Sequence, residues 1–179
     1  DCAWYNHMPA AAVREKVGSS IWNSYFKFCV VRDPYDKIVS QFWYHLSPAL
    51  RDHLAHAGFA EVRRVFNDWL PTGRMPSDRH IYTIDGSIAV DEVIRYERMP
   101  SDLERICRRL GLPWQPHRLG KYKSGFRPRP EPAIEYYDER SRRIADQLAA
   151  YRARRQRVLG GPGARAPLPT LPGAALTPP

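Results

Sequence analysis

The stretch that most constrains the fold is residues 28–46, FCVVRDPYDKIVSQFWYHL, in which a short apolar run ends abruptly at an arginine. The run Phe28–Val31 has the length and composition of a buried strand. Asp33 suits a helix N-cap, and Pro34 suits the first helical position, where its missing N–H is not needed. An apolar stripe at helical spacing follows: Ile38, Val39, Phe42 and Trp43. The stretch predicts a strand, a turn and a helix.

A second unit of the same kind follows in residues 81–111. Asp85-Gly86 is a typical dipeptide of a tight hairpin between two β-rich runs. The second run predicts a strand that ends at Tyr96-Glu97. Ser101 and Glu104 have the spacing of a capping box at the start of a helix. Gly111 is a suitable residue to end that helix.

Further helices are predicted around these units. One extends over Ala10–Tyr25 and another lies within residues 58–70. Alternating strands and helices favour an α/β domain with a mostly parallel central sheet. We assign this domain to residues 1–159, and predict that the Pro-, Gly- and Ala-rich residues 160–179 form a disordered tail. In open parallel sheets ligands bind beyond the carboxyl ends of the strands, which here are followed by Arg32 and Glu97.

The net charge of +9 favours an anionic partner, such as a nucleotide, nucleic acid or an acidic glycan. The three cysteines form no pair or cluster with metal-ligand spacing, so no metal is expected. No apolar run is long enough to span a membrane and no secretory signal is present. These features predict a soluble protein, cytoplasmic if the source is bacterial.

Arg32 stands where an oxyanion could bind, because it places a fork of donors beside the N-terminus of a helix. Ser40 lies about 10 Å along that helix from Asp33, at about 1.5 Å per residue. A long arginine side chain could share one phosphate with its hydroxyl. The alternative is that Arg32 pairs with Asp33 or Asp36, and that Ser40 is an ordinary surface serine.

The stretch resembles the core motif of sulfotransferases that use 3′-phosphoadenosine 5′-phosphosulfate (PAPS), in which a strand ends in V-R-[ND]-P and the next helix carries a serine. The resemblance is closest to the bacterial and Golgi-type branch, sulfotransferase family 2, and extends over about residues 6–148. Other segments resemble the family in the same order: NHMPAAAVREKVGSSIWNSYFKF, DEVIRYERMPSDLERICRRLGL, LGKYKSGFRP and YYDERSRRIADQL. The resemblance implies a P-loop-NTPase-like three-layer sandwich.

The family also implies roles for individual residues. Arg32 and Ser40 would hold the 3′-phosphate of PAPS, and the basic loop with Lys123, Ser124 and Arg127 would close over the same end of the nucleotide. His7 would take the proton from the acceptor, as a histidine that titrates near neutrality can. The alternatives left open are a packing or capping His7 and a solvated basic loop. Glu97 is expected to pair with a neighbouring arginine.

One family element has no counterpart in the sequence. A loop of the type P-K-[ST]-G-[ST]-[ST] normally binds the 5′-phosphosulfate, and neither it nor a Walker loop is present. We therefore expect a domain that is incomplete at its N-terminus. Such a domain would expose strand edges and apolar surface and would be poorly soluble.

The expected function is transfer of a sulfuryl group from PAPS to a hydroxyl or amine of a carbohydrate, glycolipid or small molecule. No specific nucleic acid partner is expected, and membrane association is expected only through a segment that would precede Asp1. Two other classes stay open. One is a non-catalytic basic protein that binds nucleic acid or an anionic glycan, and the other is a related P-loop-like kinase.

Overall fold

The predicted strand, turn and helix form as expected in the computed structural model, which describes residues 3–72, 78–120 and 126–147. β1 spans Phe28–Val31 and α2 spans Pro34–His45. The Asp33 carboxylate accepts a hydrogen bond of 3.0 Å from the backbone N–H of Asp36. Asp33 is therefore the N-cap of α2, as predicted, with Pro34 in the first turn.

The second unit supplies the parallel partner of β1. β4 (Glu92–Arg95) pairs with β1 from Phe28↔Glu92 to Val31↔Arg95. The strand ends just before the predicted Tyr96, where the short 3₁₀ helix η1 (Tyr96–Arg98) begins. Because the strands are parallel, Arg32 and Tyr96 follow their strands at the same end of the sheet. The Arg32 guanidinium lies 4.9 Å from the centroid of the Tyr96 ring.

The predicted capping box at Ser101 is wrong. α6 spans Met99–Arg109, so its start lies ahead of Ser101, whose hydroxyl donates to the carbonyl of Arg98. Pro100 explains the earlier start, because it lacks an N–H and its fixed φ suits the first turn. The predicted stop is confirmed, since Gly111 adopts a left-handed φ of 67°.

The long N-terminal helix is not continuous. α1 spans Ala10–Ser24, but Gly18 inside it has φ 80° and ψ 155°, which breaks the helix into two stretches. Glycine adopts this conformation without a Cβ clash. The predicted hairpin is confirmed, because β2 (Thr83–Ile84) and β3 (Ser87–Ile88) pair in antiparallel fashion around Asp85-Gly86.

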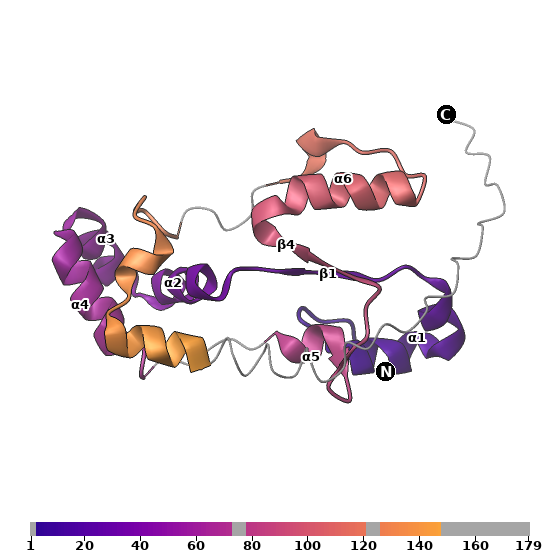
Figure 1. Cartoon of the computed structure of the whole chain (residues 1–179), viewed down its shortest axis with the longest axis horizontal. Helices are drawn as coiled ribbons and strands as arrows, with labels where there is room; N and C mark the ends of the chain where they lie inside the picture. The colour runs from indigo at the N-terminus through magenta and orange to yellow at the C-terminus, as the bar shows by residue number, and fades with distance from the viewer. Residues whose placement is uncertain (1–2, 73–77, 121–125, 148–179) are drawn as a thin grey trace.

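The remaining elements are mostly helical. They are α3 (Pro48–His56), α4 (Phe59–Trp69), α5 (Arg79–Tyr82), η2 (Pro116–Arg118), η3 (Ala133–Tyr136) and a helical stretch over residues 139–147. Figure 1 shows the two parallel strands crossing the molecule, with α6 along one side and α1 and α5 along the other. The helices α2, α3 and α4 gather with the 139–147 stretch at one end, beyond the carboxyl ends of the strands.

The main hydrophobic core lies in this helical group and not on the sheet. Its buried residues are Ile38, Val39, Phe42, Trp43, Leu46, Leu54, Val62, Phe66, Leu70, Tyr136, Tyr137 and Ala145. The aromatic rings pack edge to face, as for Phe42 against Phe66 at 5.4 Å. The apolar stripe predicted for α2 therefore packs on helices, with Trp43 fully buried.

The prediction that β1 is a buried central strand is wrong for the described part of the chain. Phe28 and Val30 are 44% and 40% exposed, whereas Ile94, the β4 partner of Val30, is fully buried. The difference arises because α6 packs on β4. Among the described residues β4 is the only neighbour of β1, so the other edge of β1 is unpaired.

The architecture is thus α/β with a small parallel sheet and a separate hairpin. None of the helices within residues 3–72, 78–120 and 126–147 combines the length and the apolar character needed to cross a membrane.

Cys29 is a free, partly buried thiol, and burial raises its pKa to about 11. It is protonated at neutral pH and therefore a poor nucleophile. The predicted tail over residues 160–179 lies outside the described residues.

The open edge of β1 predicts self-association of the chain. Lysine on an edge strand opposes pairing with another chain, so Val30→Lys should shift the protein toward monomer in sedimentation velocity measurements. Leu50→Lys is the matched control, because Leu50 is 38% exposed but lies on α3, away from the sheet. A wild-type chain that stays monomeric at all concentrations would contradict this prediction.

Candidate functional site

Arg32 binds a carboxylate of the adjoining helix. Its Nε donates to Oδ2 of Asp36 at 2.5 Å, and both side chains are 28% exposed. Asp36 stands in the first turn of α2, four residues after Arg32, so the arginine side chain folds back along the helix. The contact is one of the two alternatives that the sequence left open for this arginine.

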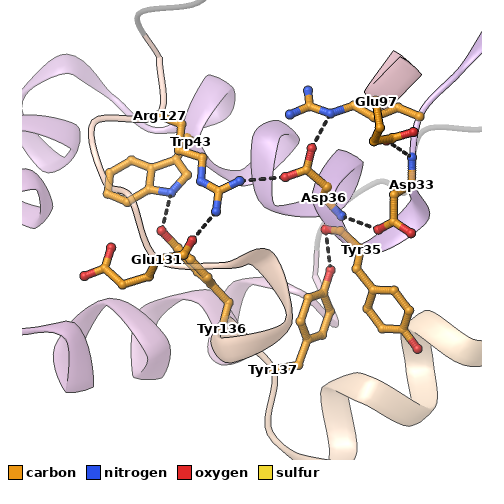
Figure 2. A network of polar contacts seen from close by, with 10 residues as sticks. Asp33, Tyr35, Asp36, Trp43, Glu97, Arg127, Glu131, Tyr136 and Tyr137 are labelled. Atoms are coloured by element: carbon orange, nitrogen blue, oxygen red, sulfur yellow. Dashed lines mark hydrogen bonds and ion pairs between the residues drawn. The ribbon is translucent and has the colours of Figure 1, made fainter. Parts of the chain in front are cut away.

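A second guanidinium reaches the same carboxylate from a distant part of the chain. Nη1 of Arg127 donates to Oδ1 of Asp36 at 2.6 Å, and Nη2 donates to the carbonyl of Glu131. The Arg127 guanidinium also lies 5.4 Å from the centroid of the Tyr136 ring. Figure 2 shows Arg127 and Asp36 pointing toward each other between α2 and the C-terminal segment. The two arginines for which the family resemblance predicts cofactor binding therefore meet at one carboxylate.

Two backbone N–H donors at the start of α2 are occupied by carboxylates of the chain. The N–H of Asp33 donates to Oε1 of Glu97 at 2.7 Å, and the N–H of Asp36 is bound by the Asp33 cap. Pro34 has no N–H. An anion at this edge would therefore be bound by side chains rather than by the helix N-terminus.

Glu97 differs from its predicted role. Its recorded contact among the described residues is the backbone N–H of Asp33, not an arginine side chain. The contact joins the segment that follows β4 to the segment that follows β1. Glu97 therefore fixes the two strand ends relative to each other at the edge where ligands are expected.

Ser40 lies one turn beyond Asp36 on the same side of α2. It is partly buried, and no side-chain hydrogen bond of Ser40 is recorded among the described residues. One further turn along, the ring of Tyr44 contacts the ring of Phe126 at 5.1 Å. Phe126 precedes Arg127, so this segment contacts α2 on both sides of Ser40 along the helix. The structure thus brings Arg32, Ser40 and Arg127 to one strip of α2.

Of the other predicted residues, only His7 lies within the described part of the chain. Lys123 and Ser124 lie outside the described residues. His7 is exposed in a turn just before α1, with φ 62°, and is followed by the buried Met8. Within the described part of the chain no hydrogen bond connects His7 with Arg32 or Ser40.

The strip is backed by tyrosines that the sequence did not single out. The hydroxyl of Tyr137 donates to the carbonyl of Tyr35 in the first turn of α2 at 2.9 Å. Burial is the main cause that raises the pKa of Tyr137, so its hydroxyl stays a donor at neutral pH. The indole N–H of Trp43 donates to the hydroxyl of Tyr136 at 3.3 Å. The only sequence signal was the Tyr136-Tyr137 pair itself, which has no helical or strand periodicity.

The site as described suits a phosphate or sulfate group better than a metal. Guanidinium forks and a hydroxyl are donors for oxyanions. No cluster of three or more histidine, cysteine or acidic side chains that could hold a metal ion occurs within the described ranges.

Comparison with known proteins gives one similarity in sequence. No protein-family model matches the chain, and no solved structure matches it. An uncharacterized protein of Archaeoglobus fulgidus is 26% identical over 106 residues, which cover 59% of this chain and 84% of that protein.

The shared carboxylate predicts a stability effect. Asp36→Asn removes the charge that binds Arg32 and Arg127, and should lower the free energy of unfolding by about 1–3 kcal/mol in urea titrations. Asp68→Asn is the control, because the exposed pair of Asp68 with Arg64 should contribute less than about 0.5 kcal/mol. Equal losses in the two variants would show that Asp36 does not hold the two arginines.

Proposed function

We propose that the chain is a PAPS-dependent sulfotransferase that transfers a sulfuryl group to a hydroxyl or amine of a carbohydrate, glycolipid or small molecule. The observation that carries the proposal is the convergence of Arg32 and Arg127 on Asp36, beside Ser40. These are residues to which the family resemblance gives the 3′-phosphate of the cofactor. Arg32 and Arg127 come from segments more than 80 residues apart in the sequence. They meet beyond the carboxyl ends of a parallel strand pair.

The contacts of Asp36 indicate how the 3′-phosphate would be bound. A carboxylate and a phosphate offer the same kind of acceptor to a guanidinium fork, and a phosphate accepts more hydrogen bonds. We infer that the phosphate takes over guanidinium contacts that Asp36 makes in the structure described here. Ser40, one turn away and without a side-chain hydrogen bond to the described residues, then donates to the same phosphate. Asp36 keeps both arginines in place before the cofactor binds.

The finer fold belongs to the same proposal. A P-loop-NTPase-like three-layer sandwich requires a parallel sheet with helices on both faces. The parallel pair β1–β4, with α6 on one side and α1 and α5 on the other, supports this assignment. In this arrangement the cofactor would lie at the edge where Arg32 and Tyr96 leave the strands.

The chain's own residues would contribute binding and proton transfer. PAPS supplies the sulfuryl group: the acceptor oxygen or nitrogen forms the new bond to sulfur, and the bond from sulfur to the phosphate oxygen breaks. The acceptor loses its proton to a base, a role proposed for His7. Arg32, Ser40 and Arg127 hold the nucleotide so that the reacting atoms are correctly placed.

Titration with adenosine 3′,5′-bisphosphate tests the cofactor site. We expect the wild-type chain to bind it more tightly than 5′-AMP, and Arg32→Ala and Ser40→Ala to weaken binding about tenfold or more through loss of phosphate contacts. Arg64→Ala is the control, because Arg64 is an exposed arginine of α4 that pairs with Asp68. Unchanged binding in the Arg32 and Ser40 variants would contradict the assignment. A preference for ATP would favour the kinase, and a preference for polynucleotide would favour the basic binding protein.

The base is tested by separating binding from turnover. His7→Ala should leave the affinity for adenosine 3′,5′-bisphosphate unchanged and remove transfer of labelled sulfate from PAPS to the hydroxylated compounds that the wild type modifies. The reason is that His7 has no recorded contact with the strip that holds the phosphate. Transfer at the wild-type rate in His7→Ala would exclude this histidine as the base.

A further inference from the structure

A hollow on the surface of the helical group is lined by two arginines. It lies where α4, η3 and the helical stretch 139–147 meet, and has a volume of about 410 Å³. This volume falls within the range of about 300–1,000 Å³ that is usual for small-molecule sites. The hollow is lined by Phe59, Arg63, Ile134, Glu135, Tyr137 and Arg142.

Within the described ranges Arg63 has no acidic partner, and its place in α4 explains why. The residue four positions later is Asn67, an amide that donates to the carbonyl of Tyr136. The recorded hydrogen bond of the Arg63 guanidinium is a long one of 3.4 Å to the carbonyl of Tyr137. The adjacent Arg64, by contrast, has an acid four positions later and pairs with it.

Arg142 lacks an acidic partner in the described part of the chain, because the carboxylates one turn away are used elsewhere. Asp138 accepts from the backbone N–H of Ser141 at 2.7 Å and so caps the helical stretch. Asp146 accepts from the hydroxyl of Tyr35. Among the described residues no carboxylate oxygen is recorded within 4.0 Å of the Arg142 guanidinium. Its neighbour Arg143 pairs with Glu139.

The apolar wall of the hollow is held in place by the core. Tyr137 is 3% exposed, its ring packs edge-on against Phe66 at 4.9 Å, and its hydroxyl is bound to the carbonyl of Tyr35. The ring of Phe59 packs against Tyr136 at 5.2 Å. A ligand that contacts these rings would therefore cause little loss of side-chain entropy on binding.

We propose that this hollow binds an organic monoanion with an apolar ring, such as an aryl carboxylate. The guanidinium groups of Arg63 and Arg142 bind the carboxylate, and the ring packs on Phe59 and Ile134. Both charges are available because no described carboxylate pairs with either arginine. Glu135 also lines the hollow and repels additional negative charge, which favours a monoanion over a dianion. This site does not depend on the proposed sulfotransferase activity.

Calorimetric titration of the whole chain with 2-naphthoate tests the proposal. Arg63→Gln and Arg142→Gln should each weaken binding about tenfold or more, because each removes a charge-assisted hydrogen bond. Arg64→Gln and Arg143→Gln are matched controls, since each is the next residue in sequence and is already paired with an acid; they should stay within about twofold of wild type.

Two further measurements test the charge preference and the place of binding. Glu135→Gln should tighten 2-naphthoate binding and reduce the preference for it over the dianion 2-naphthyl phosphate. Amide NMR shifts on addition of 2-naphthoate should be largest for residues 59–63 and 134–142. The proposal is overturned if neutral 2-naphthol binds as tightly as 2-naphthoate, if the control arginines matter as much as Arg63 and Arg142, or if the shifts lie elsewhere.

Discussion

The Asp36 carboxylate is the contact on which the arrangement of the site depends. It receives one guanidinium from the residue that follows β1 and another from the C-terminal segment. Its backbone N–H is bound by the Asp33 cap at the same time. One residue of α2 thus fixes the exit of the strand, the start of the helix and the approach of a segment some 90 residues later in the chain, as Figure 2 shows.

The two faces of α2 make different contacts. The apolar face packs into the helical core through Phe42 and Trp43, which fixes the axis of the helix. The polar strip with Asp36 and Ser40 faces the segment that carries Phe126 and Arg127. The packing of α2 into this helical core positions the polar strip, although the sheet beside it is small. The same core positions Tyr137, whose ring backs the first turn of α2 and also lines the hollow between Arg63 and Arg142.

Several features of the fold could be predicted from short stretches of the sequence. The strand at Phe28–Val31, the Asp33 cap, the hairpin turn at Asp85-Gly86 and the Gly111 stop all depend on interactions within a few residues, and the structure confirms them. Two of the errors arose where local signals competed. The break at Gly18 overrode a helical pattern, and Pro100 fixed the start of α6 ahead of the expected Ser101 cap.

The sequence by itself determined the strand Phe28–Val31, the Asp33 cap, the hairpin turn and the Gly111 stop, because capping and turn geometry are local properties. Only the tertiary structure decided which partner each charged residue of the site has. It joined Arg32 and Arg127 at Asp36 and paired Glu97 with the N–H of Asp33. It also left Arg63 and Arg142 without an acidic partner among the described residues, whereas Arg64 and Arg143 are paired. It also left Phe28 and Val30 of β1 partly exposed, while Ile94 of β4, on which α6 packs, is buried. Pairing between segments distant in sequence depends on how the core packs, and no local pattern contains that information.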